Sequence, residues 1–270
     1  MKRLVVNADD FGFTTDVNEG IVEAHRNGIL TATTLMANGD AFDDAVRLAA
    51  ANPTLDVGCH LVLIGGRSLL PPYNALPASV PELLAAIVAG RARIYDELAA
   101  QVRKIVAGGI SPTHLDTHKH THLAPPVLDA VARIAEEFGV PWVRRPFDLP
   151  ITAARGAAPW VKRATAEGLD FLRSRFHRVL ADHHCRWTDH FAGFQLTGRF
   201  RTTELVRLIQ QLPEGTTEFM CHPGRCGAEL RGARTRLKES REMELAALVD
   251  PEARRALSEC GVQLENYRRL

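Results

Sequence analysis

The first 63 residues alternate short apolar runs with helical patterns, and this alternation restricts the fold more than any other feature of the sequence. Residues 3–8, 29–36 and 55–63 are short and either apolar or rich in threonine, which predicts strands. Residues 16–27 and 40–51 lie between them and are predicted to be helices. This order predicts parallel strands joined by right-handed crossovers, and therefore an α/β fold.

The later sequence continues with strands and helices but begins with a long interruption. Residues 65–81 contain two glycines and four prolines, so we expect a loop that forms one wall of a binding cleft. Further strands are expected in "THLDTHKHTH", "VPWVRRP" and "TEFMCHPG". Further helices are expected over 95–107, 126–138, 159–180, 202–212 and 239–258. No repeat or clear linker divides the sequence, so residues 1–270 are expected to form a single domain.

Length and composition agree with one barrel. A chain of 270 residues with 46% hydrophobic side chains can bury a large core, and we expect an irregular, TIM-barrel-like (β/α) barrel with eight strands or fewer. A formal net charge of +1 gives no basis for nucleic-acid binding. No apolar run approaches the ~20 residues of a membrane-spanning helix, which leaves only peripheral membrane contact through an apolar patch. The five cysteines predict free thiols in a reducing, cytoplasmic setting.

Polar side chains with ligand chemistry recur where predicted strands end. Asp9 and Asp10 follow the first strand, His60 lies in the third, and His222 follows a late strand. Because the carboxyl ends of parallel strands form one face, these residues are expected to meet there. A divalent cation would offset the charge of the aspartate pair and leave one aspartate as a base. Taken singly, the pair could be a turn and His60 a core histidine.

The most specific single feature is the run "HLDTHKHTH" at 114–122, which places four histidines and Asp116 at every second position. In an extended strand this alternation puts all five side chains on one face. They span too far to bind one ion together, so one or two would bind metal and the others would support them, catalyse or face solvent. The alternative is a solvated, histidine-rich turn or an adventitious metal site.

Four segments together resemble the signature segments of the YdjC-like carbohydrate deacetylases. They are "VNADDFG" near the N-terminus, "GCHLVL" at 58–63, "THLDTHKHTH" at 113–122 and "CHPG" at 221–224. The resemblance extends over nearly the whole chain, and it implies a barrel similar to that of the NodB-type polysaccharide deacetylases. "HLVLIGGRSLLPP" at 60–72 looks most like the branch associated with hopanoid biosynthesis, which implies N-deacetylation of an N-acetylglucosaminyl hopanoid. Other relatives act on chitooligosaccharides.

The resemblance also implies roles for individual residues. Asp10, His60 and His118 match the family's metal ligands, with His120 and His122 as the alternatives to His118. Asp9 matches the proposed base, and His222 matches a histidine that could be the acid.

Other matches are looser. Arg145, which precedes a proline, is similar to an arginine that such deacetylases use near the base, with Arg144 as the alternative. Further residues are expected around the ligands or the substrate: Asp116, His120 and His122 as other members of the alternating run, and Asp189, whose segment "TDHFAGF" resembles a family segment without a clear role.

The expected activity is metal-dependent amide hydrolysis of an N-acetylated amino sugar on a glycan or glycolipid. Two histidines and one carboxylate suit Zn²⁺, whereas the resemblance points to Mg²⁺. Two alternatives remain. One is a phosphoesterase with two metal ions ~3.5–4 Å apart, which the surplus histidines His114, His120 and His122 could help to bind. The other is a non-catalytic sugar-binding protein. Homodimers are common in such families, so a homodimer is expected here.

Overall fold

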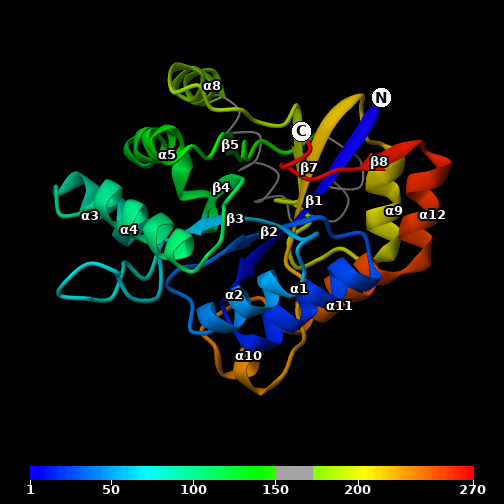
Figure 1. Ribbon diagram of the computed structural model, residues 1–270, viewed down its shortest axis with the longest axis horizontal. Coiled ribbons are helices and arrows are strands. Elements are labelled where there is room, and N and C mark those ends of the chain that lie inside the picture. The colour runs from blue at the N-terminus through cyan, green and yellow to red at the C-terminus, as the bar shows by residue number, and fades with distance from the viewer. Residues whose placement is uncertain (150–172) are drawn as a thin grey trace.

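The structure is a computed structural model that describes residues 1–149 and 173–270. Its centre is a curled parallel sheet in which seven strands follow the order β5-β4-β3-β2-β1-β7-β6, while β8 pairs with the start of β1 (Figure 1). The strands are β1 Lys2–Phe11, β2 Ala32–Leu35, β3 Asp56–Leu61, β4 His114–Thr117, β5 Trp142–Val143, β6 His190–Ala192, β7 Gly215–Cys221 and β8 Val262–Leu264.

The two edges of this sheet are brought together by isolated parallel bridges. Trp142 of β5 pairs with Arg186, and Asp148 pairs with Phe191 of β6. The backbone amide of Leu149 also donates to the carbonyl of Phe191 at 2.8 Å. The prediction of an irregular α/β barrel is therefore confirmed, and seven of its strands form the continuous path.

Helices surround the curled sheet (Figure 1). They are α1 Thr15–Asn27, α2 Phe42–Ala50, α3 Val80–Val88, α4 Ile94–Ala107, α5 Pro125–Phe138, α8 Arg173–Asp182, α9 Thr202–Gln210, α10 Ala228–Gly232, α11 Glu239–Val249 and α12 Pro251–Glu259. In the described parts of the chain, no helix has both the length and the apolar character to cross a membrane.

The burial of β1 explains its continuous apolar run. Leu4, Val5 and Val6 are all fully buried, because β1 is paired on both edges and covered on both faces. Strands in such a position cannot alternate apolar with polar residues. The polar ending of β1 is therefore an exception that needs its own explanation.

Several sequence expectations need correction. The helix expected over 239–258 is two helices, because Asp250 has an extended backbone and Pro251 starts a new helix. α3 begins at the end of the expected loop 65–81. Most of the helix expected over 159–180 lies outside the described residues.

The histidine-rich run does not form one extended strand. β4 ends at Thr117, and a short 3₁₀ helix covers His118–Leu123. Lys119 and His120 have positive φ angles of 57° and 53°, which turn the chain sharply. The expectation that residues 114–122 share one face is therefore wrong.

Candidate active site

The aspartate pair lies at an irregularity in β1. The pairing of β1 with β2 shifts by one residue between Ala8 and Phe11, and Asp10 has a φ angle of 71°. In a regular strand, Asp9 and Asp10 would point to opposite faces of the sheet. A bulge that places one residue in the left-handed region redirects a side chain, and such bulges are common next to active sites. Both carboxylates thus reach the end of the barrel.

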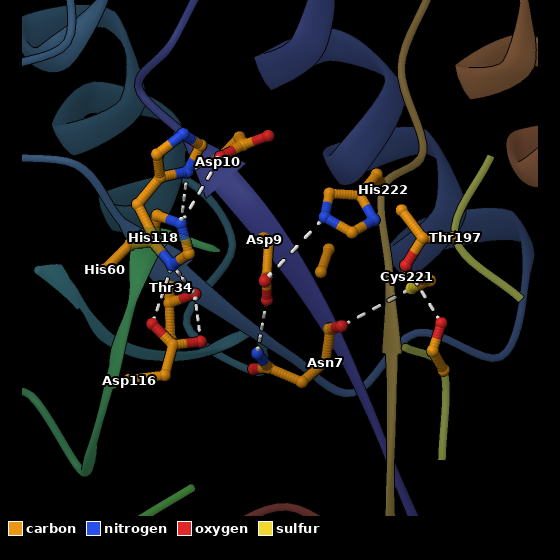
Figure 2. A network of polar contacts seen from close by, with 12 residues as sticks. Asn7, Asp9, Asp10, Thr34, His60, Asp116, His118, Thr197, Cys221 and His222 are labelled. Atoms are coloured by element: carbon orange, nitrogen blue, oxygen red, sulfur yellow. Dashed lines mark hydrogen bonds and ion pairs between the residues drawn. The ribbon is translucent and has the colours of Figure 1, made fainter. Parts of the chain in front are cut away.

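Three donor atoms converge beside the bulge. Asp10 Oδ1 lies 3.4 Å from both His60 Nε2 and His118 Nδ1. The two histidine nitrogens lie 3.2 Å from each other. Figure 2 shows His60 from β3 and His118 from the end of β4 both pointing to Asp10. Asp10 and His60 are buried, whereas about a quarter of the His118 side chain is exposed, so solvent reaches the site from its side.

His60 is oriented by Asp116. His60 Nδ1 lies 2.7 Å from Asp116 Oδ1, and Thr34 donates to the other carboxylate oxygen at 3.0 Å. This bond leaves His60 Nε2 directed at Asp10, the arrangement by which carboxylates commonly orient metal-binding histidines. Burial lowers the pKa of His60, but Asp116 and Asp9 outweigh burial and raise it to about 10. The site therefore attracts positive charge.

These residues fit one divalent cation. The buried Asp10 Oδ1 has no hydrogen-bond partner, although it lies between two imidazole nitrogens. Asp9, His60 and Asp116 also lie close enough to form a second donor group. However, Arg144 is paired with both of those carboxylates, so a guanidinium already provides the positive charge there. The group of Asp10, His60 and His118 is the better cation site.

Asp9 is held by a buried arginine. Arg144 Nη1 and Nη2 donate to the two carboxylate oxygens of Asp9 at 2.9 and 2.7 Å. Arg144 also contacts Asp116 and Glu218, each at 2.7 Å. Burial raises the pKa of Asp9, but Arg144 and His60 outweigh it and hold this pKa well below its usual range. Asp9 is therefore ionised at neutral pH.

His222 faces Asp9 from the end of β7. Its Nε2 lies 3.8 Å from Asp9 Oδ2, and Figure 2 shows the two side chains facing each other. Burial lowers the pKa of His222 to about 4, so its imidazole is neutral at neutral pH. A histidine that acts as the acid must first gain a proton, so in the resting site His222 is not yet the acid that was expected there. The ring Nδ1 has no hydrogen-bond partner.

Two predicted residues lie elsewhere. Arg145 donates to the backbone carbonyl of Asp189, and Arg144 makes the contact with Asp9 that was expected of Arg145. Asp189 accepts from the amide of Thr216 at 2.8 Å, near the start of β7. That is the end of the barrel opposite Asp9, so Asp189 is not part of this site.

The remaining histidines of the run are structural or peripheral. His114 Nε2 bonds to Asn7 Oδ1 at 2.9 Å, and its ring stacks on Tyr267. His122 lies between the Thr117 hydroxyl and the Arg144 carbonyl. His120 is buried against Phe191 and Phe194 and lies near Asp9, with its Nδ1 unpartnered.

Sequence reasoning missed the contributions of Glu218 and of α11. Arg241 of α11 forms a buried ion pair with Asp10 Oδ2. Glu244 accepts from the His222 backbone amide at 2.6 Å. The sequence does contain a pattern that indicates this role of α11. Positions 241, 244, 245 and 248 share one helix face, and the last two are leucines. Two charged residues on an apolar face indicate a buried polar site.

Comparisons with known proteins give a consistent result. The family model described as "YdjC-like protein" matches residues 3–259. A carbohydrate deacetylase of Geobacillus stearothermophilus is 36% identical over 268 residues, which cover 98% of this chain and 96% of the relative. A carbohydrate deacetylase of Brevibacillus brevis is 33% identical and covers 99% of both chains.

Among solved structures, the chain resembles a protein of Enterococcus faecalis V583 whose name assigns it to cellobiose-phosphate cleavage. The TM-score is 0.79 at 24% identity, over 99% of this chain and 98% of the other. At this level of identity the likeness supports the barrel fold alone.

Proposed function

This chain belongs to the YdjC-like protein family, and we propose that it is a carbohydrate deacetylase, an amide hydrolase that releases acetate from an N-acetylated amino sugar. One observation carries the proposal: three donor atoms 3.2–3.4 Å apart, from Asp10, His60 and His118, lie beside an ionised aspartate. The relatives named as carbohydrate deacetylases support the same chemistry.

We propose that the site holds one Zn²⁺ ion. Zinc bonds of about 2.0–2.1 Å in a tetrahedron place neighbouring donors about 3.3 Å apart. Octahedral Mg²⁺ at similar bond lengths would need donors about 2.9 Å apart and prefers oxygen. The distances of 3.2–3.4 Å and the two imidazoles therefore favour zinc. When bound, such an ion polarises a carbonyl and lowers the pKa of a water molecule.

The protein's own residues would handle the protons. Asp9 is ionised and accepts the proton of the attacking water at a carboxylate oxygen. His222 is neutral at rest, and its Nε2 lies 3.8 Å from Asp9 Oδ2, so one water molecule between them would carry this proton to Nε2. His222 would then donate it to the nitrogen of the leaving amine. Asp9→Asn should therefore remove turnover while one ion still binds, and an active Asp9→Asn enzyme would show that Asp9 is not the base.

The phosphoesterase alternative has less support. It would need a second ion close to the first, with ligands from the surplus histidines. His114 and His122 instead bond to neighbouring protein groups. Among the residues that the structure describes, the second donor group is Asp9, His60 and Asp116. It shares His60 with the first group, and both of its carboxylates are paired with Arg144.

We propose further that the amino sugar is attached to an apolar group, as in a glycosylated hopanoid. Of the six large hydrophobic side chains that are exposed in the described residues, four lie between 73 and 88, namely Tyr73, Val80, Leu84 and Val88. The last three repeat every fourth residue along α3, so they share one face. α3 follows β3, the strand that carries His60, and projects from the barrel (Figure 1). This face would contact the lipid part of the substrate or the surface of a membrane.

Acetate release by the zinc-loaded protein tests the reaction. The panel contains chitobiose and an N-acetylglucosaminyl hopanoid, with His118→Ala as the control. Acetate release that is lost in His118→Ala would support the proposal. Release of phosphate from phosphoesters, with no acetate from any N-acetylated sugar, would overturn it.

A variant of α3 tests the substrate separately. Leu84→Asp/Val88→Asp should lower kcat/KM on the glycosylated hopanoid and leave chitobiose hydrolysis unchanged. Val106→Asp, at an exposed valine of α4, is the matched control. If the double variant and the control behave alike on both substrates, α3 does not bind the apolar group.

A further inference from the structure

Arg241 lies against the metal-ligand candidate Asp10 from a distant part of the chain. The side chain belongs to α11, is almost completely buried, and contacts Asp10 Oδ2 through Nη2. Its Nε also donates at 3.3 Å to the carbonyl of Leu237, which lies just before α11, so the guanidinium is held against the segment that leads into its helix. The other oxygen of Asp10 faces His60 and His118.

We propose that Arg241 is a positioning residue that restricts Asp10 to binding the ion through one oxygen. A carboxylate can bind an ion through one oxygen or through two. The contact with Arg241 occupies Oδ2, so Oδ1 alone remains for the ion. This inference rests on the ion site proposed above but not on the identity of the substrate.

The backbone at Asp10 makes such an anchor necessary. Asp10 lies at a bulge and has a φ angle of 71°, so the regular pairing of β1 with β2 does not fix the direction of its side chain. A buried guanidinium is costly without a charged partner. In the described residues, the ion pair of Arg241 is with Asp10. If Asp10 rotated to offer both oxygens to the ion, Arg241 would be left buried and unpaired.

The same turn of α11 also holds the opposite side of the site. Glu244 accepts from the backbone amides of His222 and Gly198, each at 2.6 Å. Arg241 thus fixes a side chain at the end of β1, while Glu244 fixes the backbone at the end of β7. One turn of a helix sets the distance between the ion site and His222.

Zinc affinity of Arg241→Gln and Arg241→Met tests the proposal, measured by competition with a chromophoric chelator. Removing a positive charge beside the site would by itself strengthen zinc binding. Loss of a positioning group should instead weaken it by about 10–100-fold, as for other groups that orient metal ligands. Arg241→Lys, which keeps the charge and can still donate to Asp10, should recover part of the loss.

The visible spectrum of the Co²⁺-loaded protein provides the second readout, because four-coordinate Co²⁺ absorbs more strongly than five- or six-coordinate Co²⁺. Both neutral variants should absorb less strongly than the wild type, as Asp10 gains a second bond to the ion. An unchanged spectrum with unchanged or tighter zinc binding would overturn the role of Arg241 alone. Failure of the wild type to bind either ion would overturn the ion site as well. If Arg241→Gln does not fold, Arg241→Met, which is apolar and similar in length, carries the test.

Discussion

Replacing Arg144 with methionine removes a buried guanidinium from three carboxylates at once. In the wild type, Arg144 contacts Asp9, Asp116 and Glu218 at 2.7–2.9 Å, and all four side chains are buried. Removing one partner of a buried ion pair typically costs about 3–5 kcal/mol. The entropy of unfolding of a chain of 270 residues is about 0.6 kcal/mol/K, so this loss corresponds to a fall in Tm of about 5–9 °C.

The loss should depend on pH in a defined direction. In the wild type, Arg144 holds the pKa of Asp9 well below its usual range. The ionised Asp9 therefore stabilises the fold above that usual range, and this contribution disappears as the pH falls through the lowered pKa. In Arg144→Met, burial acts without the guanidinium and raises the pKa of Asp9. The difference between the two proteins is thus largest at neutral pH and shrinks towards pH 4.

Thermal and urea unfolding of the metal-free proteins at pH 7.5 and pH 5 measures this difference. Arg133→Met is the matched control, because Arg133 forms an exposed pair with Glu137 on the surface of α5. Such surface pairs contribute little, so the Tm of the control should stay near that of the wild type. If Arg144→Met unfolds at the same temperature as Arg133→Met at pH 7.5, the buried network does not stabilise the fold.

Three further variants test neighbouring features. Burial raises the pKa of Glu218 to about 7 from an ordinary value of 4.5, so the stability of the wild type falls as the pH rises between these values. Glu218→Gln should therefore gain stability relative to the wild type from pH 5 to pH 8. A difference in urea unfolding that does not depend on pH would contradict this. Asp116→Asn should weaken zinc binding about 10–100-fold in a chelator competition, because Asp116 orients His60. Unchanged zinc affinity would show that it does not. A Cβ on Gly20 would lie 2.4 Å from Gly224 Cα, so Gly20→Ala should displace the segment that carries His222. Both the Tm and the rate of acetate release should fall. An unchanged Tm would show that α1 shifts to make room for the methyl group.

The elements of the site that sequence could predict are those that parallel topology determines. Asp10, His60 and His118 are brought together because they lie at the carboxyl ends of β1, β3 and β4. These ends must lie on one side of any parallel sheet, whatever the exact length of each strand. The alternation of apolar runs and helical patterns was therefore enough to place them near one another.

Contacts that depend on register were not predictable in the same way. Arg144 and Arg145 are neighbours after a strand of two residues, and a shift of one residue exchanges their directions. The sharp turn at Lys119 and His120 likewise depends on local backbone angles that the alternating histidines concealed. Arg241 lies 231 residues from Asp10, and only the packing of α11 brings them into contact.

We propose that release of acetate requires one divalent ion, bound by Asp10, His60 and His118. The most direct test is a titration of the metal-free protein with Zn²⁺ while acetate release from an N-acetylated amino sugar is recorded. We predict that activity is absent without metal, rises in proportion to added zinc and reaches its maximum at one ion per chain. Full activity in the presence of a strong chelator, or a maximum reached only at two ions per chain, would show that acetate release does not depend on a single ion at this site.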